Sequence, residues 1–185
     1  TAKAFQYEDK FAGVTQSHKR KTLSKELKEK GNSAAVITLP EGIAWLLNMR
    51  GGDVEHLPIV QAFAILHSNN EVDIFVDKTK VENLAKHFGQ GINIYNENEF
   101  LQHLRKLTGS VCIDKSSLPF AAYQSLIDSK ANLDPRGDIT ALPKACKNEI
   151  ELSRARDAHL IDAIAMCKFL HWLNSQPLGM LTEID

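Results

Sequence analysis

The chain has 185 residues, of which 43% are hydrophobic and 24% charged, and this composition excludes a disordered or fibrous protein. Its 22 basic and 23 acidic residues nearly cancel, so the overall charge favours neither nucleic acid nor an anionic membrane as a partner. No apolar run approaches the roughly 18 residues that a membrane-spanning helix needs.

The first third of the chain predicts a linker, a helix, a strand and a helical turn. Residues 1–16 form a linker that leads into the domain. Residues 17–30 form a basic helix, in which interspersed glutamates favour a solvated face over a nucleic-acid site. The continuous apolar run 34–39 is typical of a buried strand. A proline then opens a helical turn over 41–47, and a loop of mixed character, 48–58, follows it.

Two further strands form a hairpin in the middle of the chain. Residues 59–66 and 72–76 are rich in apolar and β-branched side chains, and the asparagine pair 69–70 between them indicates a turn. A helix over 78–88 follows, and the strand 92–95 comes after it. Two capping boxes are expected at helix starts here, formed by Thr79 with Glu82 and by Asn96 with Glu99.

The alternation of strands and helices continues through residue 134. We expect a strand over 111–113, a helix over 119–127 and a strand over 131–133. Strands that alternate with helices of about ten residues are typical of βαβ units. The region 34–134 therefore predicts an α/β layered domain with a largely parallel sheet, one hairpin and flanking helices.

A connector rich in proline and glycine divides the chain into the domain 17–143 and a segment 144–185. This segment begins with one long helix, 148–173. In the window 158–173, 12 of 16 residues are apolar, which predicts a helix buried on several sides. Little sequence follows that could cover it, and 182–185 reads as a helix start, so we expect the protein to continue beyond residue 185.

Few residues carry a chemical signature. Three scattered cysteines, Cys112, Cys146 and Cys167, form no CxxC pair, which predicts a reducing, cytoplasmic environment. Nucleotide-binding, metalloprotease and serine-hydrolase motifs are missing. The helical pairs Cys167 with His171 and His159 with Asp162 are expected to have packing or capping roles rather than to bind a metal.

The loop 48–58 is the stretch most suggestive of function. It places Arg50, Asp53 and His56 between two buried elements, and loops that leave sheet ends commonly carry binding sites. Two glycines in it allow a tight backbone bend. The alternative is a surface loop in which Arg50 and Asp53 simply pair with each other.

The same region carries a family resemblance that extends over nearly the whole chain. The run 43–51 reads IAWLLNMRG and is followed by Asp53, Val54, His56 and Pro58, and it resembles the signature of the second domain of long-form Xaa-Pro aminopeptidases (aminopeptidase P). Residues 147–173 are similar to the helix that leads into their catalytic domain, and 11–13 to the segment that precedes the second domain. Departures are small: Gly52, Leu57 and Ala163 stand where Ser, Asn and Gly are common.

The resemblance implies a creatinase/prolidase N-terminal-domain-like fold, a layered mixed sheet flanked by helices and followed by a long helix. The family removes the residue that precedes proline at a peptide N-terminus. Its "pita-bread" catalytic domain holds two divalent metals, usually manganese, and none of its ligand motifs occurs in this chain. We therefore expect a non-catalytic domain with no metal ligands, and a metal site beyond residue 185. This domain would wall the substrate cleft and support a homodimer, with Arg50, Asp53 and His56 at the cleft rim.

Other classes of function remain open at this point. The chain could be a stand-alone creatinase-like module that binds peptides, as related domains do in histone chaperones, although it lacks an acidic patch. It could also be a purely structural spacer. A small complete enzyme of another type is disfavoured because no convergent polar triad is apparent.

Overall fold

The computed structural model describes residues 2–177, 179, 181–182 and 184. It divides into two compact units, Thr1–Cys146 and Lys147–Asp185. The first unit contains the sheet and its helices, and the second contains one long helix.

In the described residues, six strands form one mixed sheet in the order β6-β5-β4-β2-β7-β8. Strand β4 runs antiparallel to both of its neighbours, β2 and β5, and the other three pairs are parallel. The prediction of a largely parallel sheet with one hairpin is confirmed. The strands are β2 (Ala34–Ile37), β4 (Phe63–His67), β5 (Val72–Phe75), β6 (Ile92–Tyr95), β7 (Ser110–Cys112) and β8 (Asn132–Asp134).

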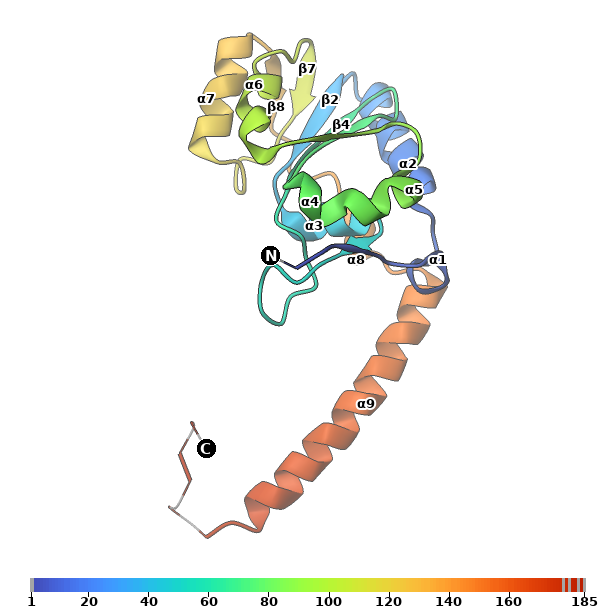
Figure 1. Ribbon diagram of the computed structural model, residues 1–185, viewed down its shortest axis with the longest axis vertical. Helices are drawn as coiled ribbons and strands as arrows, with labels where there is room; N and C mark the ends of the chain where they lie inside the picture. The colour runs from blue at the N-terminus through green and yellow to red at the C-terminus, as the bar shows by residue number, and fades with distance from the viewer. Residues whose placement is uncertain (1, 178, 180, 183, 185) are drawn as a thin grey trace. The chain divides into compact units, whose positions relative to one another are not determined.

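Helices cover both faces of this sheet, because successive strand side chains point to opposite faces. On β2, for example, Ala35 and Ile37 belong to one apolar cluster and Ala34 and Val36 to the other. Figure 1 shows α2 on one side of the sheet and α6 with α7 on the other. The first face packs against α2 (Gln16–Glu29), α3 (Pro40–Leu46), α4 (Lys78–Val81) and α5 (Ala85–Phe88), and the second against α6 (Phe100–Leu104) and α7 (Phe120–Ser129).

The expected helix over 78–88 is interrupted. A 3-10 turn, η1 (Glu82–Leu84), separates α4 from α5. The predicted Thr79–Glu82 capping box is also wrong, because Asp77 caps α4 by accepting a hydrogen bond from the Thr79 backbone N–H at 3.0 Å. Hydrogen bonds from the side chain and backbone of Thr79 lower the pKa of the Asp77 carboxyl.

The second capping box is confirmed. The side chain of Asn96 and that of Glu99 cap each other's backbone at the start of η2 (Glu97–Glu99), which leads into α6. By contrast, β4 begins at Phe63 rather than at residue 59. Residues 59–62 are not part of the sheet, because their backbone is used by the preceding loop, in which the Asp53 N–H donates to the Ile59 carbonyl at 3.3 Å.

The N-terminal residues expected to be a linker contain two short elements, β1 (Phe5–Gln6) and α1 (Asp9–Ala12). Strand β1 pairs antiparallel with β3 (Met49–Arg50), directly after α3. At the other end of this unit, α8 (Ala141–Ala145) follows β8.

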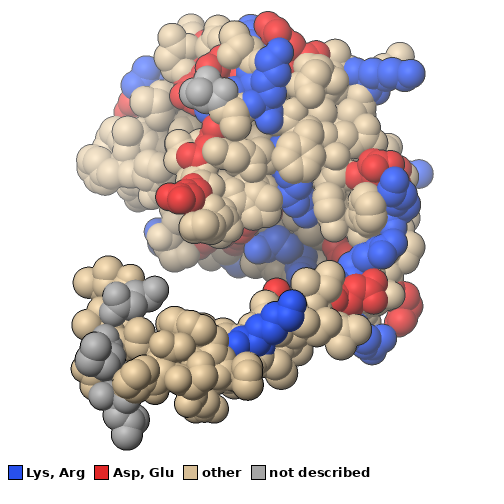
Figure 2. All heavy atoms as spheres, turned by 60° about the horizontal axis from the view of Figure 1, so that its bottom comes forward, with Lys and Arg blue, Asp and Glu red and all other residues tan. Residues whose placement is uncertain are grey.

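The second unit contains α9 (Glu149–Asn174), which begins with a capping box between Asn148 and Glu151. Its apolar side chains were expected to be buried, but Leu160 and Ile161 are 66% and 68% exposed. On the face that Figure 2 shows, the charged side chains of this unit gather toward the start of the helix and the rest is mostly uncharged. Within the second unit no described residue covers these side chains, so burial of the helix stays a prediction about the longer parent protein. Of the expected helix start at 182–185, Glu183 and Asp185 lie outside the described residues.

Candidate functional site

The loop between β3 and β4, residues 51–62, projects from the body of the first unit below α3 and α4 (Figure 1). It contains Asp53 and His56, and Arg50 lies immediately before it. The structure gives these three predicted site residues different environments.

Arg50 is half-buried and turned toward the protein. Its Nη1 donates hydrogen bonds to the carbonyl oxygens of Ala44 and Met49, both at 2.9 Å. Its guanidinium carbon lies 4.1 Å from the centre of the Tyr7 ring, a cation–π contact with the N-terminal segment. Arg50 therefore joins α3, β3 and the N-terminal segment at the base of the loop.

Asp53 is held by a residue that the sequence does not associate with the loop. Its Oδ2 lies 2.9 Å from Nζ of Lys80 on α4, and the two side chains are only 6% and 9% exposed. The same oxygen accepts the Gln61 backbone N–H at 2.8 Å. Asp53 thus fixes both ends of the loop to α4, whereas the sequence had suggested Arg50 as its partner.

His56 lies at the tip of the loop. A tight turn joins Val54 to Leu57, with the Leu57 N–H donating to the Val54 carbonyl at 3.2 Å. His56 has φ 64, a left-handed conformation that is uncommon for a non-glycine residue. Its side chain is 91% exposed, and its Nε2 lies 3.5 Å from Oε1 of Glu55, which is equally exposed. The loop therefore has a fixed base and a tip that presents a histidine and a carboxylate to solvent.

Gly51 closes the base of the loop because no side chain fits there. A Cβ on Gly51 would lie 2.5 Å from Cγ2 of Val60 and 2.9 Å from the carbonyl oxygen of Ile59. We expect Gly51→Ala to lower the free energy of unfolding by about 1–3 kcal/mol through overpacking, as measured by urea denaturation. Gly52→Ala is the control, since among the described residues its Cβ would meet Ala2 at 3.4 Å, an ordinary van der Waals contact. Equal effects of the two substitutions would contradict this account of the loop base.

Asn48 connects the segment before the loop to a buried ammonium group, a connection that sequence reasoning missed. Asn48 is 1% exposed, and its Oδ1 accepts a hydrogen bond from Lys19 Nζ at 2.7 Å. Lys19 also donates to the Trp45 carbonyl at 3.0 Å and lies 4.4 Å from the centre of the Trp45 ring. The ammonium of a lysine on the expected solvated helix face is thus buried beside α3.

The other groups of Asn48 bind the N-terminal segment. Its Nδ2 donates to Oδ1 of Asp9 at 3.2 Å and to the Val14 carbonyl at 2.8 Å, and its own carbonyl accepts the Tyr7 N–H at 2.8 Å. Asn48 has φ 46, a conformation that asparagine tolerates better than most residues. The residues that follow α3 therefore fix residues 7–14 onto the domain.

In the described part of the chain, His, Cys, Asp and Glu side chains form no group of three or more that could hold a metal ion. The two helical pairs noted in the sequence, His159 with Asp162 and Cys167 with His171, lie exposed on α9 rather than packed. As for a membrane, the described helices include none with the length and apolarity to cross one.

The sequence pattern of the creatinase/prolidase N-terminal domain matches residues 1–151. The chain belongs to this family. The predicted fold, a mixed sheet flanked by helices and followed by a long helix, is thereby confirmed. The family match covers the loop 51–62 and the residues that anchor it.

Relatives of this creatinase/prolidase domain are longer proteins. It is 32% identical to Xaa-Pro aminopeptidase 1 of Dictyostelium discoideum, over 93% of this chain and 27% of that protein. It is 30% identical to aminopeptidase P1 of Arabidopsis thaliana, over 90% of this chain and 30% of that one. The chain spans less than a third of the length of these relatives.

A solved structure gives the same relationship. X-prolyl aminopeptidase from Caenorhabditis elegans, described as a cytosolic enzyme with a di-nuclear active site, matches with a TM-score of 0.85 and 26% identity. The match covers 97% of this chain and 31% of that one. The resemblance to Xaa-Pro aminopeptidases expected from the sequence is confirmed.

Proposed function

We propose that this chain is a non-catalytic domain of a Xaa-Pro aminopeptidase that removes the residue preceding proline from a peptide N-terminus. The match to the Caenorhabditis elegans enzyme over 97% of the chain carries this proposal. Two divalent metals, which we take to be manganese, would lie in the part of the parent protein beyond residue 185. The parent enzyme would be a cytosolic homodimer. Within it, residues 17–143 would act as a wall of the substrate cleft.

The loop 51–62 is the part of this wall that we propose as the cleft rim. The fixed base and exposed tip of the loop support a division of roles among its residues. His56 would contact the peptide, since a positioned histidine can donate or accept a hydrogen bond. Arg50, through the carbonyls of Ala44 and Met49, would fix the position of the loop so that His56 can make this contact. Asp53 would do the same through its ion pair with Lys80. Neither residue would take part in bond cleavage.

Steady-state kinetics of the full-length parent enzyme test whether the loop 51–62 forms the cleft rim. We expect His56→Ala to raise KM for a short Xaa-Pro peptide by about two- to tenfold, the loss of one hydrogen bond, with metal content unchanged. Arg50→Ala should also weaken turnover of this peptide, because the loop is no longer held at its base. His18→Ala, on the exposed side of α2, is the matched control. Unaltered kinetics of both loop variants would overturn the rim assignment.

A further inference from the structure

A cavity of about 230 Å³ lies in the first unit, away from the loop 51–62. Helix α2 forms one wall, and residues 136–143, which run from the segment after β8 into α8, form the other. Pockets for drug-sized ligands typically measure about 300–1,000 Å³, so this one suits a smaller molecule. Its apolar lining consists of Leu23, Leu27, Cys112, Ile139, Leu142 and Pro143.

Cys112 contributes an uncharged thiol to this apolar lining. Its Sγ lies 3.7 Å from the Gly137 carbonyl oxygen, to which it donates. Burial, with the nearby charge of Asp134, raises the pKa of this thiol to about 11, so it stays protonated at neutral pH. A protonated, buried thiol is neither a nucleophile nor a metal ligand and behaves as a small hydrophobic group. The cavity floor is therefore suited to a hydrocarbon.

Two cations line the same cavity. Lys30 pairs with Glu26 one turn earlier on α2. Arg136 pairs through its Nε with Asp134, and its side chain is 47% exposed. Among the described residues, no hydrogen-bond partner is found for the two terminal nitrogens of Arg136. These nitrogens form the planar fork that binds a carboxylate with two parallel hydrogen bonds.

We propose that this cavity binds a small aliphatic carboxylate, with its hydrocarbon body on the leucine and cysteine floor and its carboxylate on Arg136. Isocaproate and L-leucine share this chemistry and differ by the ammonium group of the amino acid. Asp138 lies in the same lining and provides negative charge for such an ammonium. This site goes beyond the proposed role in the aminopeptidase and does not depend on it.

Titration of the ¹⁵N-labelled 185-residue chain, followed by NMR, tests the site. Isocaproate, L-leucine and isoamylamine serve as probes with similar hydrocarbon bodies and different charges. We expect saturable shifts confined to residues 23–32, 112 and 136–143 for isocaproate, and none for isoamylamine. Tighter binding of L-leucine than of isocaproate would identify an amino acid as the ligand, and the reverse order a simple fatty acid. Saturation by neither carboxylate, or equal binding of the amine, would overturn the proposal.

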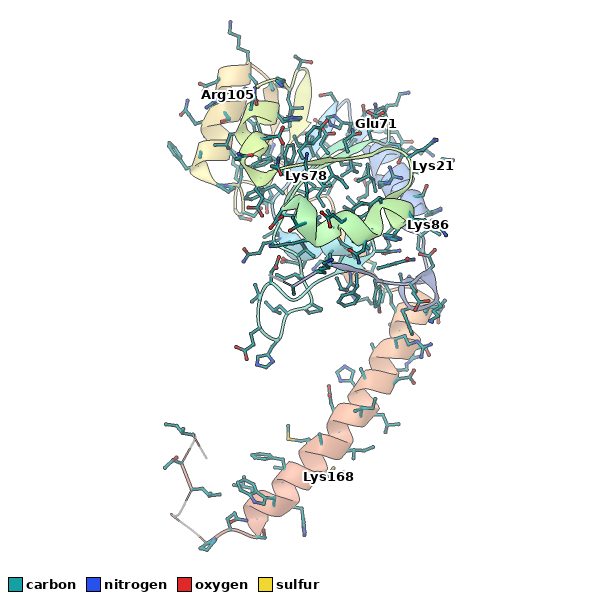
Figure 3. All side chains as sticks on the ribbon, viewed as in Figure 1. Lys21, Glu71, Lys78, Lys86, Arg105 and Lys168 are labelled. Atoms are coloured by element: carbon teal, nitrogen blue, oxygen red, sulfur yellow. The ribbon has the colours of Figure 1, made fainter. Side chains whose placement is uncertain are left out.

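Two variants assign the binding to this cavity. Arg136→Gln should weaken carboxylate binding about tenfold or more, because it removes a charge-assisted pair of hydrogen bonds. Leu142→Asp should weaken it similarly by adding a negative charge at a side chain that is 72% exposed, where the fold tolerates the change. Arg105→Gln is the control, since Arg105 lies beside α6 and α7 on the other face of the sheet (Figure 3). Unchanged affinity of the first two variants would contradict the site.

Discussion

Replacing Lys80 with methionine should lower the free energy of unfolding by about 3–5 kcal/mol, because it leaves the Asp53 carboxylate buried without its charged partner. The Asp53 side chain is 6% exposed, and among the described residues it would keep one donor, the Gln61 backbone N–H. Methionine preserves most of the lysine stem, so loss of packing contributes little. Urea denaturation measures the change, and hydrogen exchange in the loop 51–62 should accelerate with it.

Two further variants separate the ion pair from other effects. Lys78 lies two residues earlier on the same helix and is exposed, so Lys78→Met should change the free energy of unfolding by less than about 0.5 kcal/mol (Figure 3). Adding Asp53→Asn to Lys80→Met removes the unpaired charge, and the double variant should be less destabilised than the sum of the two single ones. If Lys80→Met lowers the free energy of unfolding no more than Lys78→Met does, Asp53 is not held by Lys80.

Asn48→Ala should lower the free energy of unfolding by about 3 kcal/mol. The substitution removes the acceptor for the buried Lys19 ammonium and both donors to the N-terminal segment. Alanine also tolerates the left-handed backbone at φ 46 poorly. Urea denaturation measures the total effect, and hydrogen exchange of residues 5–14 measures the release of the N-terminal segment.

Asn48→Gly resolves the two contributions. Glycine accepts the left-handed backbone, so this variant should be more stable than Asn48→Ala by about 1 kcal/mol and still be clearly destabilised by the lost hydrogen bonds. The control is Asn69→Ala, because Asn69 is exposed and, in the described part of the chain, its side chain bonds within its own turn, to Glu71. Should Asn48→Gly be as stable as the unmodified chain, the side-chain network does not anchor residues 7–14.

The elements that the sequence predicts best are those determined by local patterns. Three features depend on neighbouring residues only: the continuous apolar run of β2, the asparagine turn of the β4–β5 hairpin and the Asn96–Glu99 capping box. The interruption of the helix at η1 could not be predicted in this way. Its 3-10 turn has no proline or glycine to mark it, and the true cap, Asp77, lies before the expected one.

For the candidate site, too, the sequence predicts the local features but not the contacts between distant residues. The family resemblance directs attention to the loop after β3 and to Arg50, Asp53 and His56. The partners of these residues are distant in sequence: Asp53 pairs with Lys80, Arg50 stacks on Tyr7, and Asn48 holds Lys19. A charged residue with a distant partner has no local signature, so Lys19 is expected on a solvated helix face and no neighbouring residue marks Lys80 as a partner of the loop.

We propose that this chain is an auxiliary domain and that metal binding and hydrolysis require the rest of the parent protein. The most direct measurement supplies the 185-residue chain with manganese and determines both the bound metal and the release of the first residue from an Xaa-Pro-Pro peptide. We predict neither tight manganese binding nor turnover, while the full-length parent shows both. Stoichiometric metal with turnover by the 185-residue chain would contradict the claim and would place a catalytic site within these residues.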